Sequence, residues 1–233
     1  MRDSMRRRLV LFDIDGTLIT DGGAARDAFA DALRTVFSYS GELRRYDFSG
    51  RTDPQITRMV LRDHGFSDQQ IDERMTEVFG VYIDRLGANA TSQRIRALPG
   101  ITELLDTLAE EPAVTLALLT GNIEGGARLK LTPPDLNRYF PFGAFGSDSE
   151  HREDLPPIAV DRASDLHGHR FHGQDVVIIG DSIYDIRCGV PHGATTIALA
   201  TGKTPSETLR AENPRHFFQS AEDLGALRRA ILG

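Results

Sequence analysis

The sequence predicts an α/β protein in which a doubly wound parallel sheet carries an inserted all-helical domain. Five short runs of residues are apolar on both faces, and each run is followed by a loop and a helical pattern. This alternation is typical of a Rossmann-like parallel sheet that is covered by helices. The long stretch between the first two runs shows helical patterns alone, which indicates an insertion.

The predicted strands are residues 8–14, 113–120, 142–146, 175–181 and 194–200. Helical patterns cover residues 100–110, 124–131, 157–166, 183–190 and 221–231. Parallel strands need crossover connections, which are usually helices, and the order along the chain supplies them. We therefore expect helices on both faces of the sheet.

The inserted stretch has the pattern of amphipathic helices at residues 24–37, 54–64 and 68–86. In the last of these, apolar residues recur at the spacing of a buried helix face: Ile71, Met75, Val78, Phe79, Tyr82, Ile83 and Leu86. A crossover needs only about a dozen residues, so the remainder is best explained as a separate helical cap. We assign residues 1–19 and 91–233 to the sheet domain and residues 20–90 to the cap.

Composition and charge favour a small-molecule partner. The chain of 233 residues has a net charge of −7, which offers no basic surface to nucleic acid or to an anionic membrane. No run approaches the roughly 18 apolar residues of a membrane span. The single cysteine, Cys188, agrees with a reducing compartment and is expected in the core. We expect a cytoplasmic protein, and the sequence leaves its oligomeric state open.

Acidic and polar residues follow the predicted strands at the edge where such sheets bind ligands. They are Asp13, Asp15, Thr120, Gly121, Asn122, Arg152, Asp181 and Asp185. Two carboxylates at 4 Å repel by about 4 kcal/mol at an effective dielectric constant of ~20, so we expect a cation among them. Oxygen ligands without a Cys/His cluster favour a hard ion, Mg²⁺ before Zn²⁺. The neutral donors and the arginine are suited to a phosphoryl group.

Three motifs carry a resemblance to a known family. In chain order, DIDGTL (13–18), LLTGN (118–122) and GDSIYDI (180–186) resemble motifs one, two and four of the haloacid dehalogenase-like (HAD) superfamily. A helical insert after motif one is similar to the branch that contains phosphoglycolate phosphatases and β-phosphoglucomutases. Motif three of this family commonly has a lysine, and here we assign its role to Arg152. The chain has two lysines, Lys130 and Lys203, and we expect Lys130 on a solvated helix face.

The resemblance implies roles for the acidic residues. Asp13 would attack phosphorus and form an aspartyl-phosphate, and Asp15 would act as general acid and then as general base. The resemblance also implies that Mg²⁺ is held by the Asp13 carboxylate, the Asp15 backbone carbonyl and Asp181, with Asp185 in support. Thr120 and nearby backbone N–H groups would bind the transferring phosphoryl group.

Further substrate contacts are expected from two loops. Gly121 and Asn122 follow Thr120 in motif two. In the cap, residues Gly50, Arg51 and Thr52 lie in the loop that faces the active site in this branch. The same loop has the features of a helix start, because Thr52 or Asp53 can cap a helix that Pro54 opens.

These expectations favour a Mg²⁺-dependent phosphatase of small phosphate monoesters, with phosphoglycolate as the leading named substrate. A phosphotransferase of the β-phosphoglucomutase kind shares the core motifs and is the alternative. A non-catalytic protein that retains the fold is a third interpretation. Dehalogenases of this family lack the second motif-one aspartate, and its phosphonate hydrolases need a cap lysine, whereas residues 1–129 contain no lysine.

Overall fold

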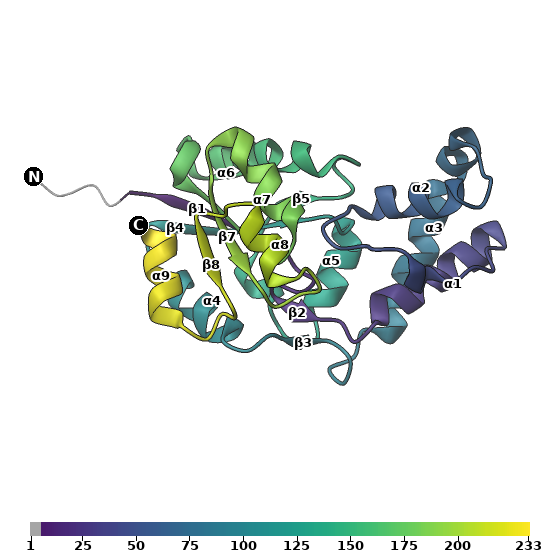
Figure 1. Cartoon of the computed structure of the whole chain (residues 1–233), viewed down its shortest axis with the longest axis horizontal. Coiled ribbons are helices and arrows are strands. Elements are labelled where there is room, and N and C mark those ends of the chain that lie inside the picture. Colours follow the sequence, from purple (N-terminus) through teal and green to yellow (C-terminus); the bar gives the residue numbers. More distant parts are fainter. Residues whose placement is uncertain (1–5) are drawn as a thin grey trace, which may run out of the picture.

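Figure 1 shows the computed structural model, which describes residues 6–233; residues 1–5 of the predicted sheet domain lie outside the described residues. A six-stranded sheet with helices on both faces forms one end of the molecule. Helices α1 (Ala24–Phe37), α2 (Asp53–Arg62) and α3 (Asp68–Asn89) form the other end. The predicted fold class is therefore confirmed, while the exact boundaries of the cap stay a prediction.

The sheet has the strand order β5-β4-β1-β6-β7-β8, and all its pairings are parallel. Its strands are β1 (Arg8–Phe12), β4 (Val114–Thr120), β5 (Gly143–Phe145), β6 (Val176–Gly180), β7 (Thr195–Leu199) and β8 (His216–Phe218). Chain order reverses at β1, which lies between β4 and β6. At such a switch point the loops after neighbouring strands diverge and leave a crevice for a ligand.

Alternate residues of β1 enter hydrophobic cores on opposite faces of the sheet. Leu9 and Leu11 belong to the core beneath α6 (Leu155–His167) and α7 (Ile183–Gly189). Val10 and Phe12 belong to the core beneath α4 (Ile101–Ala109), α5 (Glu124–Leu131) and α9 (Leu224–Leu232). Burial on both faces explains why the strand is an unbroken apolar run. Cys188 lies in the first of these cores, as predicted.

The sequence analysis did not predict four short elements, namely β2 (Ile19–Thr20), β3 (Arg96–Ala97), α8 (Ser206–Ala211) and β8. These elements are too short to produce a recognisable hydrophobic period. β2 and β3 pair antiparallel and join the inserted helices to the sheet domain. Short 3₁₀ turns occupy Leu43–Arg45, Asn137–Tyr139, Arg152–Asp154, Gly173–Asp175 and Val190–His192.

The inserted helices pack around α3. The predicted face of α3 is buried at Ile71, Val78, Tyr82 and Leu86, and Met75, Phe79 and Ile83 pack against the same core. The Phe29 ring of α1 meets the Tyr82 ring edge-on, with centroids 5.5 Å apart. α2 and α3 each begin with a capping box, in which the side chains of Thr52 and Ser67 accept from the third residue of their helices.

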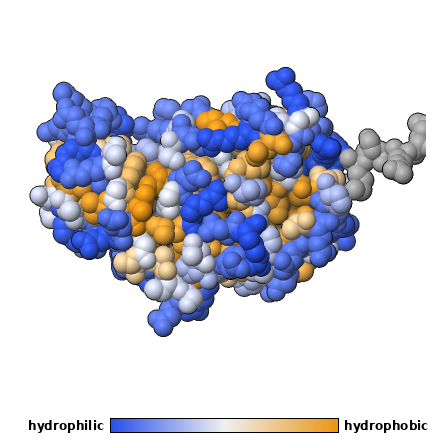
Figure 2. Space-filling view, turned by 180° about the vertical axis from the view of Figure 1, so that it is seen from behind, coloured by the Kyte–Doolittle hydropathy of each residue, from blue (hydrophilic) through white to orange (hydrophobic). Residues whose placement is uncertain are grey.

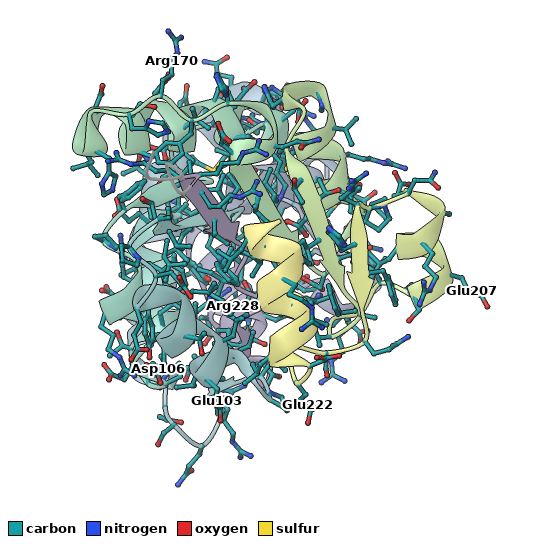
Figure 3. All side chains as sticks on the ribbon, turned by 90° about the vertical axis from the view of Figure 1, so that its left-hand side faces the viewer. Glu103, Asp106, Arg170, Glu207, Glu222 and Arg228 are labelled. Atoms are coloured by element: carbon teal, nitrogen blue, oxygen red, sulfur yellow. The ribbon has the colours of Figure 1, made fainter. Side chains whose placement is uncertain are left out.

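The surface is mixed in character. Figure 2 shows hydrophilic side chains over much of one face, with hydrophobic side chains between them on both the sheet domain and the inserted helices. At the end far from the inserted helices, Figure 3 shows α9 in front of the strands and beside α4, with Arg228 between them. Arg228 donates from Nε to Glu111 at 3.0 Å. Among residues 6–233, no helix is long and apolar enough to cross a membrane.

Leu86→Ala should lower the free energy of unfolding by about 2–5 kcal/mol, because it leaves a cavity where a fully buried leucine packs. Denaturant unfolding followed by circular dichroism measures the change. Arg85→Ala, at an exposed position of the same helix, is the control and should stay within about 0.5 kcal/mol of the original protein. Equal stability of the two variants would contradict the buried face of α3.

Candidate active site

Three of the predicted carboxylates meet at the carboxyl ends of β1 and β6. Asp13 follows β1, Asp181 follows β6, and Asp185 lies in the first turn of α7. All three are buried, and each offers an oxygen within 4.8 Å of the others. Asp185 is held in place by the start of α7, since its Oδ2 accepts from the backbone N of Ser182 at 2.9 Å and from the Ser182 hydroxyl at 2.6 Å.

Arg152 joins this cluster from the 3₁₀ turn that follows β5. Its side chain is 4% exposed, and its Nη2 donates to Asp13 Oδ1 at 3.1 Å and also to Asp185 Oδ1. The predicted motif-three arginine therefore lies against two of the three carboxylates. Burial alone would lower the pKa of Arg152, but Asp185 and Asp13 raise it above its usual value, so the guanidinium stays charged.

The electrostatics of the cluster fit a metal ion. Burial raises the pKa of Asp13 to about 7, although Arg152 opposes this. Burial, Asp13 and Asp185 together raise the pKa of Asp181 well above its usual value, and the Thr17 hydroxyl, 3.2 Å from Asp181 Oδ1, only partly offsets this. A divalent cation would reverse these shifts by favouring the ionised carboxylates. The donor atoms are all oxygens, which are the ligands that hard cations such as Mg²⁺ prefer.

Two glycines let the backbone approach Asp181 closely. Gly16 has φ of 84°, and a Cβ there would lie 2.7 Å from Cγ of Asp181. A Cβ on Gly202 would overlap the same carboxylate. The glycine of DIDGTL therefore supplies both a left-handed turn after the motif and room for the Asp181 side chain.

Thr120, Gly121 and Asn122 leave the end of β4 beside the carboxylates. The Asn122 side-chain amide donates to Thr120 Oγ1 at 2.8 Å and to Asp15 Oδ2 at 2.8 Å. The Gly121 carbonyl accepts from the backbone N of Asp53 at 2.8 Å. A Cβ on Gly121 would overlap the Arg51 carbonyl, so this glycine allows the loop before α2 to seat on motif two.

The prediction that Lys130 lies on a solvated face of α5 is wrong. Its side chain is 4% exposed, and its Nζ donates to Asp15 Oδ2 at 2.7 Å and to Asn122 Oδ1 at 2.6 Å. α5 is covered by α3 of the insert, and a Cβ on Gly126 would lie 3.1 Å from the Tyr82 ring. Lys130 follows Gly126 by four residues and therefore shares its covered face.

The sequence did contain a signal for this burial. Gly126, Ala127, Lys130 and Leu131 are all buried and form one stripe at helical spacing. A lysine is rarely buried without a partner, and the residues of α5 itself do not offer one. Here the partner is Asp15. Burial by itself lowers the pKa of Lys130, but Asp15 and other nearby acidic groups raise it above its usual value, so the ammonium is not a nucleophile.

A cavity of about 440 Å³ lies between the sheet domain and the inserted helices. Predicted site residues line it from both sides: Asp13, Asp15, Gly50, Arg51, Thr120, Gly121, Asn122, Arg152 and Asp181. Lys130 and Tyr82 also contribute to the wall. Thr52 and Asp185 are buried next to it and hold neighbouring elements in place.

The loop before α2 fastens the insert over this cavity. The Thr52 hydroxyl donates to the Glu150 carbonyl at 2.7 Å, and Arg58 Nε donates to the Glu150 carboxylate at 2.9 Å. Asp53 accepts from the backbone N of Ile123 at 2.9 Å, which satisfies the start of α5. Burial raises the pKa of Asp53 to about 6. The sequence suggested Asp53 only as a cap of its own helix, and its contact with α5 could not be anticipated.

The arrangement defines a class: an α/β protein with an oxygen-lined acidic site at the switch point of its sheet, beneath helices inserted after the first strand. Residues 10–199 match the family model of haloacid dehalogenase-like hydrolases, and the chain belongs to this family. The chain is thus an enzyme of the HAD-like hydrolase family.

Individual relatives agree with this family. A phosphoglycolate phosphatase of Pseudomonas savastanoi pv. phaseolicola is 26% identical over 214 residues, covering 89% of this chain and 74% of the relative. A pyrophosphatase of Halalkalibacterium halodurans is 25% identical over 221 residues, covering 94% and 96%. The solved structure of a hydrolase from Pseudomonas syringae is similar with a TM-score of 0.72 at 21% identity, covering 97% and 99%. At that identity the structural likeness concerns the fold.

Proposed function

We propose that this HAD-like hydrolase is a Mg²⁺-dependent phosphatase that hydrolyses small phosphate monoesters. The observation that carries the proposal is the buried cluster of Asp13, Asp181 and Asp185, with oxygens within 4.8 Å of one another, at the wall of the cavity. Asp15 lines the same cavity and supplies a second kind of carboxylate, because its side chain is 40% exposed. One buried and one accessible carboxylate in the same motif suit two different chemical roles.

Asp13 is the nucleophile in this mechanism. One of its oxygens forms a bond to phosphorus as the bond from phosphorus to the leaving oxygen breaks, which gives an aspartyl-phosphate. Arg152 donates to Oδ1 of Asp13 and thereby orients the carboxylate. Thr120 and the backbone N–H groups of the motif-two loop would bind the oxygens of the phosphoryl group.

Asp15 moves the protons. In the first step it protonates the departing oxygen of the ester. In the second step it takes a proton from the water that attacks the aspartyl-phosphate, so phosphate leaves and Asp13 is regenerated.

Asp13, Asp181 and Asp185 would hold Mg²⁺, with the backbone carbonyl of Asp15 as a further ligand. The bound ion would neutralise charge on the phosphoryl oxygens and on the carboxylates. These residues suit Mg²⁺ because they are buried and because all of their donor atoms are oxygens.

Phosphoglycolate is the named substrate that we favour. Support comes from relatives that carry the name phosphoglycolate phosphatase and from Arg51, which lines the cavity. The guanidinium of Arg51 lies 5.5 Å from the Tyr184 ring centroid. A guanidinium binds a carboxylate through two parallel hydrogen bonds, and the glycolate leaving group contains a carboxylate. The alternative, a phosphotransferase of the β-phosphoglucomutase kind, would isomerise a sugar 1-phosphate instead of releasing phosphate from it.

Asp13→Asn should preserve the fold and lower kcat by about 1,000-fold or more, because an amide does not attack phosphorus. Phosphate release measures the rate. In the original protein, acid quenching after addition of ³²P-labelled substrate traps the labelled intermediate, and peptide mapping identifies the labelled residue. Asp84→Asn, at an exposed position of α3, serves as the control with unchanged activity. Label on a residue other than Asp13 would refute the assignment of the nucleophile.

A chelator should abolish phosphate release, and added Mg²⁺ should restore it, because the cluster needs a cation to balance its charge. Asp181→Ala should raise the Mg²⁺ concentration that gives half-maximal activity, since it removes one oxygen ligand. A titration of activity against Mg²⁺ measures both effects. Full activity in excess chelator would exclude the metal.

Arg51→Ala should reduce kcat/KM for phosphoglycolate about 10- to 150-fold more than for p-nitrophenyl phosphate, because a charged hydrogen bond to the leaving group contributes about 1.5–3 kcal/mol. Steady-state kinetics with both substrates give the comparison. Arg45→Ala removes an exposed arginine that pairs with Asp63 within the insert, and it should affect both substrates equally. An equal loss on both substrates from Arg51→Ala would mean a structural role for this residue.

A further inference from the structure

We propose that Lys130 is a positioning residue for Asp15: together with Asn122, it fixes the carboxylate that exchanges protons with the leaving group. This inference rests on the proposed function, in which Asp15 is the general acid and base. Neither motif one nor motif two contains Lys130, which lies near the end of α5.

The contacts form a closed triangle. Lys130 Nζ lies 2.7 Å from Asp15 Oδ2 and 2.6 Å from Asn122 Oδ1, and Asn122 Nδ2 lies 2.8 Å from Asp15 Oδ2. The lysine donates to the amide oxygen, which leaves the amide nitrogen to donate to Asp15. Each member therefore fixes the orientation of the other two.

Both bonds reach the same oxygen of Asp15. Oδ2 accepts from Lys130 and from Asn122, so Oδ1 is the oxygen available for proton transfer. The exposed fractions agree with this division, because the Asp15 side chain is 40% exposed and the Lys130 side chain is 4% exposed. The lysine thus contacts Asp15 from the protein side and leaves its cavity side accessible.

The burial of a lysine here calls for an explanation other than stability. Transfer of an ammonium group out of water costs several kcal/mol, and a buried ion pair is often no more stabilising than apolar residues of the same volume. The neighbouring positions on this face of α5 are occupied by the small or apolar residues Gly126, Ala127 and Leu131. A methionine at position 130 would suit that packing, whereas the ammonium donates hydrogen bonds to Asp15 and Asn122.

Two buried cations at the site each contact a different carboxylate of DIDG. Arg152 contacts Asp13 and Asp185, and Lys130 contacts Asp15. Each aspartate of the motif therefore has a cation of its own, supplied by a different element of the sheet domain. This pairing turns the two carboxylates in different directions, as their separate roles as nucleophile and proton carrier require.

If Lys130 positions Asp15, the effect of removing Lys130 on kcat/KM should depend on the leaving group. A positioned general acid matters most for an ester with a basic leaving oxygen and least for one that leaves without a proton. The ratio kcat/KM covers the steps up to departure of the leaving group, so it isolates this effect from hydrolysis of the aspartyl-phosphate. The substrates are p-nitrophenyl phosphate and phenyl phosphate, which differ little in shape and strongly in leaving-group basicity.

Lys130→Met should lower kcat/KM for phenyl phosphate about 10- to 100-fold more than for p-nitrophenyl phosphate. This is less than the roughly 100- to 10,000-fold that a general acid contributes, because Lys130 acts through Asp15 and Asp15 remains. Lys130→Gln, which can still donate a hydrogen bond, should show a smaller difference between the two substrates. Inhibition by inorganic phosphate should be unchanged in both variants, because the groups that bind the phosphoryl remain. Arg128→Met removes a cation from the same helix outside the triangle and should show no leaving-group dependence.

Asp15→Asn separates failure of this inference from failure of the proposed function. If Asp15→Asn lowers kcat/KM equally for both substrates, Asp15 is not the general acid and the proposed mechanism is wrong. Suppose instead that the loss of kcat/KM in Asp15→Asn is larger for phenyl phosphate, whereas folded Lys130→Met and Lys130→Gln lose equally on both substrates. The mechanism then stands and the role of Lys130 is refuted. Thermal unfolding and circular dichroism establish that each variant is folded.

Discussion

Charge pairing between buried cations and carboxylates is the interaction on which this site depends. Asp13 and Asp15 are separated by one residue, and their charges would repel strongly if both side chains turned to the same point. Arg152 and Lys130 direct them apart, one toward Asp181 and Asp185 and the other toward motif two. The remaining negative charge of the cluster would favour a bound cation.

The inserted helices take part in this electrostatic arrangement. They cover α5, and without that cover Lys130 would face water, where an ion pair with Asp15 contributes little. The loop before α2 contacts the Gly121 carbonyl through the Asp53 backbone N, so the insert and the motif-two loop are joined directly at the cavity wall. Any motion of the insert therefore changes both access to the cavity and the environment of Asp15.

The parts of the fold and site that sequence could predict are those set by local pattern. Five strands follow from unbroken apolar runs, and the strand-end rule brings Asp13, Asp181 and Thr120 to one edge. Lys130 and β8 could not be predicted in the same way. The environment of Lys130 is made by α3, which lies far away in sequence. β8 begins with a histidine, and all three of its residues are only half-buried, so no unbroken apolar run marks it as a strand.

The antiparallel pair of β2 and β3 has a consequence for how the chain folds. β1 pairs with β4, and between them lies the whole insert, so this contact closes a very long loop. Loop-closure entropy rises only slowly with length, yet the search for such a contact is slow. Once Ile19 pairs with Ala97, the ends of the insert are held together and the effective loop becomes short. Because the cost of closing a loop rises only slowly with its length, an insert of a different length would change the cost of joining Ile19 to Ala97 by little.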